Sequence, residues 1–227
     1  MGFSRVLEPE LLDELAADDP RARASRRDLA RINFVMRQTG IMAALLRPLA
    51  PPSRLADLGS GDGRFLLGVA RRLAPRWPGV TALVVDRQNI VSPETRAGFA
   101  ALGWTCQTIA GDIFDVMPQL DAEIITVNLF LHHLDDVALA RLMALAAVKA
   151  RAFIACEPRR SPLALLASRM VFALACNDVT RHDAVASVRA SFAGRELSRL
   201  WPDKGWRLQE GPAFPFSHVF SARRDAV

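Results

Sequence analysis

Apolar residues in the middle of the chain form short continuous runs that alternate with helical patterns. Strands covered by helices on both faces are apolar on both sides, so such runs predict buried parallel strands. The run that starts at Arg54 leads into a stretch where Phe65, Leu66, Val69, Ala70 and Leu73 are apolar, which is typical of an amphipathic helix. Further runs predict strands over 80–85, 104–110, 122–129 and 152–156. The alternation of strands and helices predicts an α/β fold.

The ends of the chain have other patterns. Residues 1–50 predict a helical extension or lid with two helices, the second over 28–46, and residues 51–227 then form the main part of a single domain. Ser92-Pro93 and Ser161-Pro162 are typical helix starts, with serine as cap and proline in the first turn. The second of these helices is expected to reach about residue 176. Further helices are predicted over 181–192 and 195–201, and two last strands over 206–210 and 216–222.

A glycine-rich loop follows the first predicted strand. Asp57 precedes Gly59, Ser60, Gly61 and Gly63, so glycine occupies every second position before the next helix. Glycine permits a sharp turn and a close approach of the backbone to a ligand, and the helix N-terminus attracts a carboxylate or a phosphate. A dinucleotide site would need a further glycine at the position of Arg64.

The loop resembles that of class I S-adenosylmethionine (SAM) methyltransferases. The resemblance implies SAM as cofactor and a Rossmann-like seven-stranded sheet in the order 3-2-1-4-5-7-6, with an antiparallel last strand and helices on both faces. Asp86 lies at the end of the second strand, where a carboxylate can accept hydrogen bonds from ribose hydroxyls. The resemblance places Asp112 and Ile113 beside the adenine. The remaining expected cofactor contacts are Arg87, Gly111, Asn128 and Leu129.

The segment after the fourth strand bears on the reaction. It contains neither the proline-aromatic signature of amino-purine and amide N-methyltransferases nor the Pro-Cys of cytosine C5 enzymes. Instead Leu131-His132-His133-Leu134-Asp135-Asp136 resembles the His-Asp-Trp-Ser-Asp segment of phenolic O-methyltransferases, although His133 and Leu134 depart from it. In that family the first histidine is the general base, which implies this role for His132. Glu157, at the end of the fifth strand, is the candidate that orients it. The alternative is that His132 packs under the cofactor.

Segments 156–160 and 177–183 carry a narrower resemblance, to bacterial small-molecule O-methyltransferases that act beside type III polyketide synthases. This resemblance implies secondary metabolism and a phenolic or resorcinol-like acceptor hydroxyl. The candidate acceptor contacts are Phe34, Met42, His133, Met170 and His182.

Composition limits the other classes of function. The chain of 227 residues is 51% hydrophobic, and its N-terminus is acidic and shows no secretory signal, so a cytoplasmic protein without a membrane span is expected. Its three cysteines include no CxxC pair, and no metal site is expected.

The net charge is +5, and only two of the 29 basic residues are lysines. Five arginines cluster within 21–31, and they leave open an RNA or protein methyltransferase, although no nucleic-acid partner is expected. An inactive SAM-binding scaffold is the other alternative. The acceptor, the choice among O-, N- and C-methylation, and the oligomeric state, a homodimer included, stay open.

Overall fold

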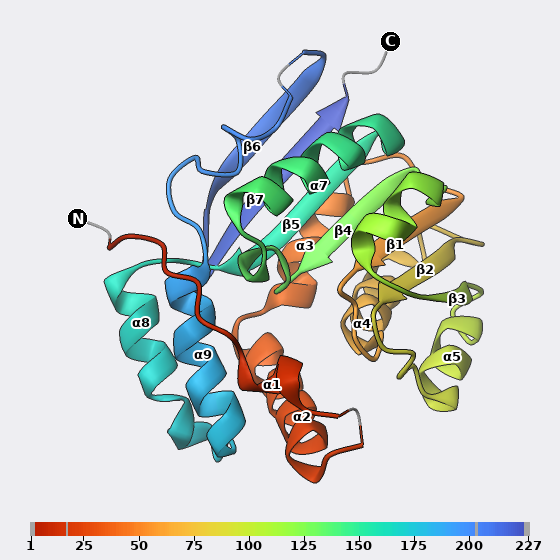
Figure 1. The fold of residues 1–227 in the computed structure, drawn as a ribbon. Helices are drawn as coiled ribbons and strands as arrows, with labels where there is room; N and C mark the ends of the chain where they lie inside the picture. Colours follow the sequence, from red (N-terminus) through yellow and green to blue (C-terminus); the bar gives the residue numbers. More distant parts are fainter. Residues whose placement is uncertain (1–2, 17, 203, 225–227) are drawn as a thin grey trace.

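The computed structural model describes residues 3–16, 18–202 and 204–224. Its strands form one seven-stranded sheet in the order β3-β2-β1-β4-β5-β7-β6 (Figure 1). β1 to β5 are parallel, and β7 pairs antiparallel with both β5 and β6. The predicted fold class and strand order are therefore confirmed. The strands are β1 (Arg54–Leu58), β2 (Thr81–Asp86), β3 (Thr105–Ala110), β4 (Ile124–Asn128), β5 (Ala152–Pro158), β6 (Trp206–Ala213) and β7 (Ser217–Arg224).

Helices cover both faces of this sheet. Ser92 and Ser161 accept hydrogen bonds from the third residue of their helices, Thr95 N and Ala164 N, both at 3.2 Å, so the predicted helix starts are confirmed. The α-helices are α1 (Leu11–Glu14), α2 (Pro20–Val35), α3 (Gln38–Leu46), α4 (Arg64–Leu73), α5 (Pro93–Ala100), α6 (Ile113–Val116), α7 (Asp136–Lys149), α8 (Pro162–Arg169) and α9 (Asp178–Ala190). Short 3-10 turns are η1 (Met117–Gln119), η2 (Leu131–His133) and η3 (Val171–Leu174).

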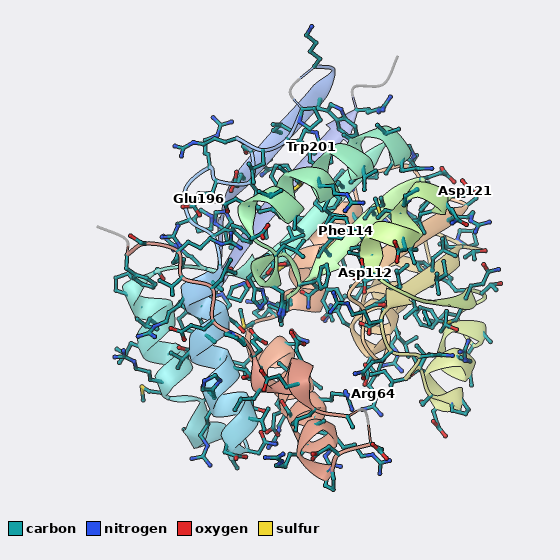
Figure 2. The ribbon with its side chains drawn as sticks, viewed as in Figure 1. Arg64, Asp112, Phe114, Asp121, Glu196 and Trp201 are labelled. Carbon is teal, nitrogen blue, oxygen red and sulfur yellow. The ribbon has the colours of Figure 1, made fainter. Side chains whose placement is uncertain are left out.

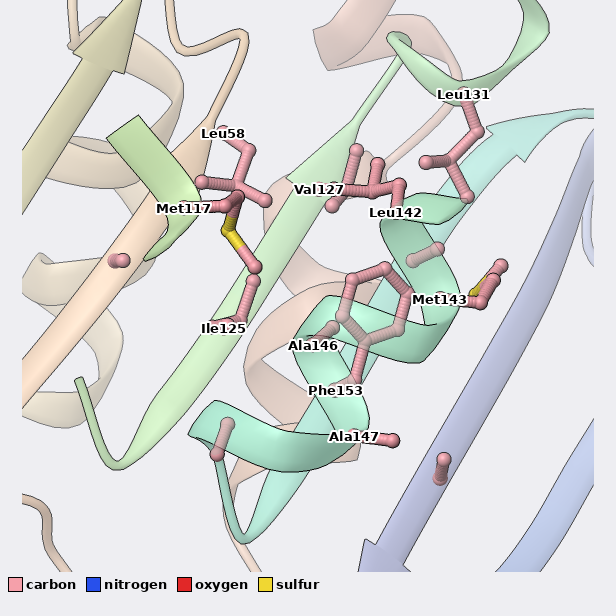
Figure 3. Packing of buried hydrophobic residues seen from close by; sticks show 14 of the residues in the cluster. Leu58, Met117, Ile125, Val127, Leu131, Leu142, Met143, Ala146, Ala147 and Phe153 are labelled. Atoms are coloured by element: carbon pink, nitrogen blue, oxygen red, sulfur yellow. The ribbon is translucent and has the colours of Figure 1, made fainter. Parts of the chain in front are cut away.

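The core consists of two apolar clusters, one on each face of the sheet. Because side chains alternate along a strand, neighbouring residues of β5 such as Phe153 and Ile154 belong to different clusters. On one face Leu142 and Ala146 of α7 pack near Phe153 (Figure 3). On the other face α3 and α4 cover the sheet. The sheet is thus apolar on both sides, as the continuous apolar runs predict.

The prediction of one continuous helix over 28–46 is wrong. α2 ends at Val35, and α3 begins at Gln38 after Arg37 adopts a left-handed conformation with φ of 57°. The two helices then pack on different partners, α2 against α9 and α3 against α4. No glycine or proline marks this break, so packing decides it.

Two further helix predictions need correction. The helix that starts at Pro162 ends at Arg169 and is followed by the 3-10 turn η3, where a single helix to residue 176 was expected. Residues 195–201 form turns and not a helix. Here the carboxylate of Glu210 accepts from Leu197 N at 3.1 Å and Ser198 N at 2.7 Å, so this segment is bonded to β6.

The beginning of the chain crosses the molecule as a strap. We call residues 3–14 the N-terminal strap; it passes α8 and α9 before α1 (Figure 1). Val6 N donates to Arg189 O at 3.1 Å, and Leu11 N and Leu12 N donate to the carboxylate of Asp183 at 2.8 and 3.0 Å. The strap is therefore held to α9 at several points.

Across residues 3–16, 18–202 and 204–224, we find no helix with both the length and the apolar character that crossing a membrane requires.

Candidate cofactor and acceptor site

The glycine loop lies between β1 and α4, and the surroundings differ from one of its glycines to the next. Gly59, Gly61 and Gly63 all have positive φ, at 66°, 54° and 73°. A Cβ atom on Gly59 would stand 2.4 Å from Phe130 Cδ2, so packing within the protein requires glycine there. A Cβ on Gly61 would meet no atom within 4 Å. Gly61 therefore faces open space, where a ligand can approach the backbone.

The end of β2 holds this loop in place. The carboxylate of Asp86 accepts hydrogen bonds from Gly61 N at 2.8 Å and from Gln88 N at 2.9 Å. Ser60 N and Ser60 Oγ both donate to Val85 O, at 3.1 and 3.2 Å. The strand end that is expected to bind the ribose is therefore bonded directly to the loop.

Two polar side chains are buried nearby on the strands that flank the loop. Asp57 on β1 is buried and accepts a hydrogen bond from Thr126 Oγ1 at 2.8 Å. Burial raises the pKa of Asp57 to about 7; the Thr126 hydrogen bond opposes this shift, and the charge of Asp86 adds to it. At the end of β4, Asn128 Oδ1 is buried and has no hydrogen-bond partner among the described residues. An unsatisfied buried oxygen at this edge suits a polar group of a ligand.

The raised pKa of Asp57 leads to a prediction about stability. The folded protein retains a proton on this carboxyl up to about pH 7, whereas the unfolded chain loses it near the ordinary value of 3.8. Stability is therefore lost as the pH rises from about 4 to about 7, by about 4 kcal/mol from this group. Asp57→Asn cannot ionise, so its free energy of unfolding, measured by urea denaturation, should lack this loss. Parallel pH profiles for the two proteins would contradict the prediction.

The candidate adenine contacts lie at the end of β3. Asp112 caps α6 by accepting from Phe114 N at 2.9 Å, and its other oxygen accepts from Arg87 at 3.0 Å (Figure 2). Gly111 N donates to Asp86 O at 3.0 Å, and Ile113 packs into the core. The candidate residues at the ends of β2 and β3 are thus joined by hydrogen bonds.

The two candidate catalytic residues are in contact. Glu157 is fully buried at the end of β5, and its Oε1 accepts from Phe130 N at 3.0 Å and from Leu131 N at 2.9 Å. Its Oε2 lies 2.6 Å from His132 Nδ1. Leu129, with φ of 53°, bends the chain so that η2 lies over this carboxylate. Because Glu157 binds Nδ1, the other ring nitrogen of His132 is directed away from the sheet.

That second nitrogen meets Glu10 of the strap, a residue that the sequence analysis missed. Glu10 Oε1 lies 3.2 Å from His132 Nε2 and accepts from the hydroxyl of Ser187 on α9. Burial lowers the pKa of His132, but Glu157 and Glu10 outweigh burial and raise the pKa to about 10. Burial raises the pKa of Glu10, and the contacts with His132 outweigh it and bring the pKa down to about 2. With the strap in this position, His132 is an imidazolium between two carboxylates.

His133 binds the same strap. Its Nε2 lies 3.9 Å from Glu10 Oε2, and its Nδ1 lies 3.1 Å from Asp13 Oδ2. Its side chain is 23% exposed. The two histidines of η2 and the strap therefore form one connected group of charges.

A cavity of about 160 Å³ begins at Glu10. Its wall is mainly apolar and comes from α2, α8 and α9, with Leu129 and Phe216 at the end nearest the sheet. Polar groups on the wall include Glu10, Ser25, Thr180, Asp183 and Ser187. The cavity is thus an apolar space with its acidic side next to His132.

The candidate acceptor contacts differ in whether they line this cavity. Met170 lines it. Met42 is fully buried in the core, and the side chain of Phe34 is 85% exposed, so neither belongs to the wall. His182 points its Nδ1 to Asp183 at 3.0 Å, and it is Asp183 that lines the cavity. Of the candidate acceptor contacts, Phe34, Met42, His133 and His182 thus do not line this cavity.

The segment of turns at 195–201 does not line this cavity. Trp201 and Glu196 lie beside β6 and β7, on the other side of the molecule from Arg64 at the start of α4 (Figure 2). Trp201 packs against Phe153 and Phe220 in the core. This segment is structural and does not contribute to the cavity.

No protein family model and no curated protein matches this sequence. Solved structures share its fold. An O-methyltransferase family protein from Burkholderia thailandensis is 18% identical with a TM-score of 0.59, over 93% of this chain and 64% of that one. The mitomycin 7-O-methyltransferase MmcR is 18% identical with a TM-score of 0.63, over 94% and 60%. This chain therefore spans less than two thirds of the length of these two proteins.

A third structure matches over nearly its whole length. The plantazolicin methyltransferase BpumL, in complex with a monoazolic desmethylPZN analog and SAH, is 14% identical with a TM-score of 0.65, over 91% of both chains. At these identities the comparison shows a common fold. The chain has the α/β fold of these methyltransferases.

Proposed function

We propose that this protein is a SAM-dependent methyltransferase that acts on a hydroxyl group of a small apolar molecule. The observation that carries the proposal is the Glu157–His132 pair, which lies beside the glycine loop at one end and the apolar cavity at the other. In open α/β sheets ligands bind at the carboxyl ends of the strands, where both sites are found. Methyltransferases of the same fold support this reading.

The residues around the loop fit SAM. Gly61 leaves room for a ligand, Asp86 can accept from ribose hydroxyls, and the unpartnered Asn128 Oδ1 can accept from an ammonium group. SAM supplies an electrophilic methyl group when it is bound. We assign the surrounding contacts to Asp57, Gly59, Ser60, Gly63, Arg87, Gly111, Asp112, Ile113 and Leu129.

The proton of the acceptor hydroxyl goes to His132 in this proposal. An acceptor that enters from the cavity takes the place of Glu10 at Nε2. Removal of one of the two carboxylates lowers the pKa of the ring, so His132 can become neutral while Glu157 holds its Nδ1–H. Nε2 is then the base for the hydroxyl, a role worth about 10²- to 10⁴-fold in rate.

The cavity favours an apolar, aromatic acceptor. Ile32, Met36, Met170 and Val171 line it, and Glu10 with its hydrogen-bond partner Ser187 provides a polar end. A phenol or a resorcinol places its ring against such a wall and its hydroxyl at the polar end. We therefore keep phenolic, polyketide-type compounds of secondary metabolism as the acceptor class.

Transfer of a labelled methyl group from SAM tests the function. We expect label in phenols or resorcinols from a panel of small molecules, measured with the full chain. Bulk RNA and bulk protein serve as separate arms, since the arginines of α2 leave these acceptors open. Label that enters only RNA or only protein would reject a small-molecule acceptor.

Asp86→Asn tests the cofactor site. The substitution removes the charge that binds the loop and the ribose, so SAM affinity measured by calorimetry should fall by about 5- to 150-fold, or about 1–3 kcal/mol. Asp121→Asn is the control, because Asp121 is an exposed carboxylate with only an ion pair to Arg54. Unchanged SAM affinity in Asp86→Asn would remove Asp86 from the site.

A further inference from the structure

We propose that Glu10, His132 and His133 form a binding site for a divalent transition-metal cation, and that a cation there prevents His132 from acting as a base. The first part concerns a site that the sequence analysis did not expect. The second part rests on the proposed function. We call these three residues the Glu10–His132–His133 cluster.

The donor atoms of the cluster have suitable spacing. One ligand atom from each residue lies within 4.8 Å of the other two. The carboxylate of Glu10 lies between the histidines, 3.2 Å from His132 Nε2 and 3.9 Å from His133 Nε2. Ligand atoms at about 2.1 Å from a tetrahedral cation lie about 3.4 Å apart, so small adjustments bring all three into bonding distance. Two imidazoles and one carboxylate suit zinc, copper, nickel or iron.

Each histidine also has a carboxylate on its other nitrogen. His132 Nδ1 is 2.6 Å from Glu157 Oε2, and His133 Nδ1 is 3.1 Å from Asp13 Oδ2. Histidine ligands of metal ions usually donate their second N–H to such a carboxylate, which fixes the tautomer and the ring orientation. Both Nε2 atoms are thereby left on the side of Glu10, in the arrangement that a shared cation needs.

The burial of the cluster and the charges around it both favour a bound cation. The side chains of His132 and Glu10 are 2% and 12% exposed, so a cation would be largely shielded from water. Three carboxylates, those of Glu10, Asp13 and Glu157, surround the two imidazoles. The guanidinium of Arg5 lies near the cluster but is bonded to Asp136 at 2.8 Å, to Leu134 O at 2.6 Å and to the backbone oxygen of His132 at 3.5 Å. The three carboxylates around the two imidazoles therefore favour a bound dication.

Cobalt(II) gives a readout that does not depend on catalysis. The full chain, without SAM or acceptor, should bind one equivalent of Co²⁺ with a visible absorption band of low-coordinate cobalt, and Zn²⁺ should abolish the band. His133→Gln should weaken Co²⁺ binding by at least about 10²-fold, and Asp13→Asn by about 10- to 100-fold. His182→Gln is the matched control, since His182 is also paired with a carboxylate but lies outside the cluster.

Two outcomes of the cobalt experiment contradict the proposed cation site. Absence of the band, or Co²⁺ binding that is the same in His133→Gln as in the unaltered protein, would overturn the cation site. The cluster would then serve only to hold the strap on η2 by ion pairs.

Methyl transfer tests the second part. Zn²⁺ should inhibit the unaltered enzyme over the concentration range in which it displaces cobalt. Asp13→Asn should need about 10- to 100-fold more Zn²⁺ and keep its turnover in the presence of a chelator, because Asp13 supports His133 from its other nitrogen and does not line the cavity. Turnover that Zn²⁺ leaves unchanged at full occupancy would contradict this part. Failure of the proposed function would leave the cobalt spectrum unaffected, so the two failures are distinguishable.

Discussion

Replacement of His132 by glutamine should lower methyl-transfer turnover by about 10²- to 10⁴-fold while SAM affinity changes by no more than about fivefold. Glutamine retains polar atoms for the contacts with Glu157 and Glu10, but it cannot take a proton at neutral pH. His132 lies at the end of β4 next to the acceptor cavity, whereas the loop that binds SAM in our proposal is made by β1, β2 and α4. Steady-state kinetics and calorimetry on the same preparation separate the two effects.

His218→Gln is the control for loss of a buried histidine. His218 on β7 is as buried as His132, and its Nε2 lies 2.9 Å from the carboxylate of Glu210. Its substitution perturbs a comparable histidine–carboxylate pair outside the cavity, so turnover of the folded protein should be retained. Near-full turnover in His132→Gln would mean that His132 is a packing residue. Transfer would then depend on proximity and orientation alone, which an acidic phenol permits.

Gly61→Val should abolish most of the SAM affinity without unfolding the protein. A Cβ at Gly61 would have no protein atom within 4 Å apart from its own chain neighbours, so the folded chain has room for a side chain to begin there. In the complex its side chain would occupy the space of the ligand, and overpacking of about 1–3 kcal/mol corresponds to about 5- to 150-fold weaker binding. Calorimetry with SAM measures this loss.

Gly103→Val separates steric exclusion from backbone strain. Gly103 also has a positive φ, 72°, and open space at its Cβ, but it lies after α5, away from the loop. Both variants should lose a similar amount of stability because of the strained backbone, and only Gly61→Val should lose SAM affinity. Equal affinities in the two variants would place SAM away from this loop. Gly59→Val is unsuitable for this purpose, since its side chain would collide with Phe130.

The strands of the sheet could be predicted because their signals are local. A strand buried on both faces must be apolar throughout; the start of β1 and both ends of the other four parallel strands agree with the prediction to within two residues. The caps Ser92 and Ser161 could be predicted because their signal is local as well. The serine side chain accepts a hydrogen bond from an N–H in the first turn, and proline after it suits the first helical position.

The breaks in the helices could not be predicted in this way. Arg37 has no local reason to adopt a left-handed conformation; it does so between α2, which packs on α9, and α3, which packs on α4. Leu197 and Trp201 are apolar at helical spacing, yet residues 195–201 form turns in which Trp201 packs against Phe153 and Phe220. In both cases contacts between distant parts of the chain outweigh helix propensity.

The amino-acid sequence by itself determined the sheet, the glycine loop and the pairing of His132 with Glu157. These two residues follow neighbouring parallel strands, and the register that joins Asn128 to Cys156 brings the strand ends together. Only the tertiary structure decided the second partner of His132. Glu10 is 122 residues away, on a strap whose acidic residues the sequence analysis used only as evidence against a secretory signal. The position of the strap depends on hydrogen bonds to α9, which no pattern along the chain encodes. The acceptor cavity and the Glu10–His132–His133 cluster arise in the same way, because each needs groups from several elements that only the folded chain brings into contact.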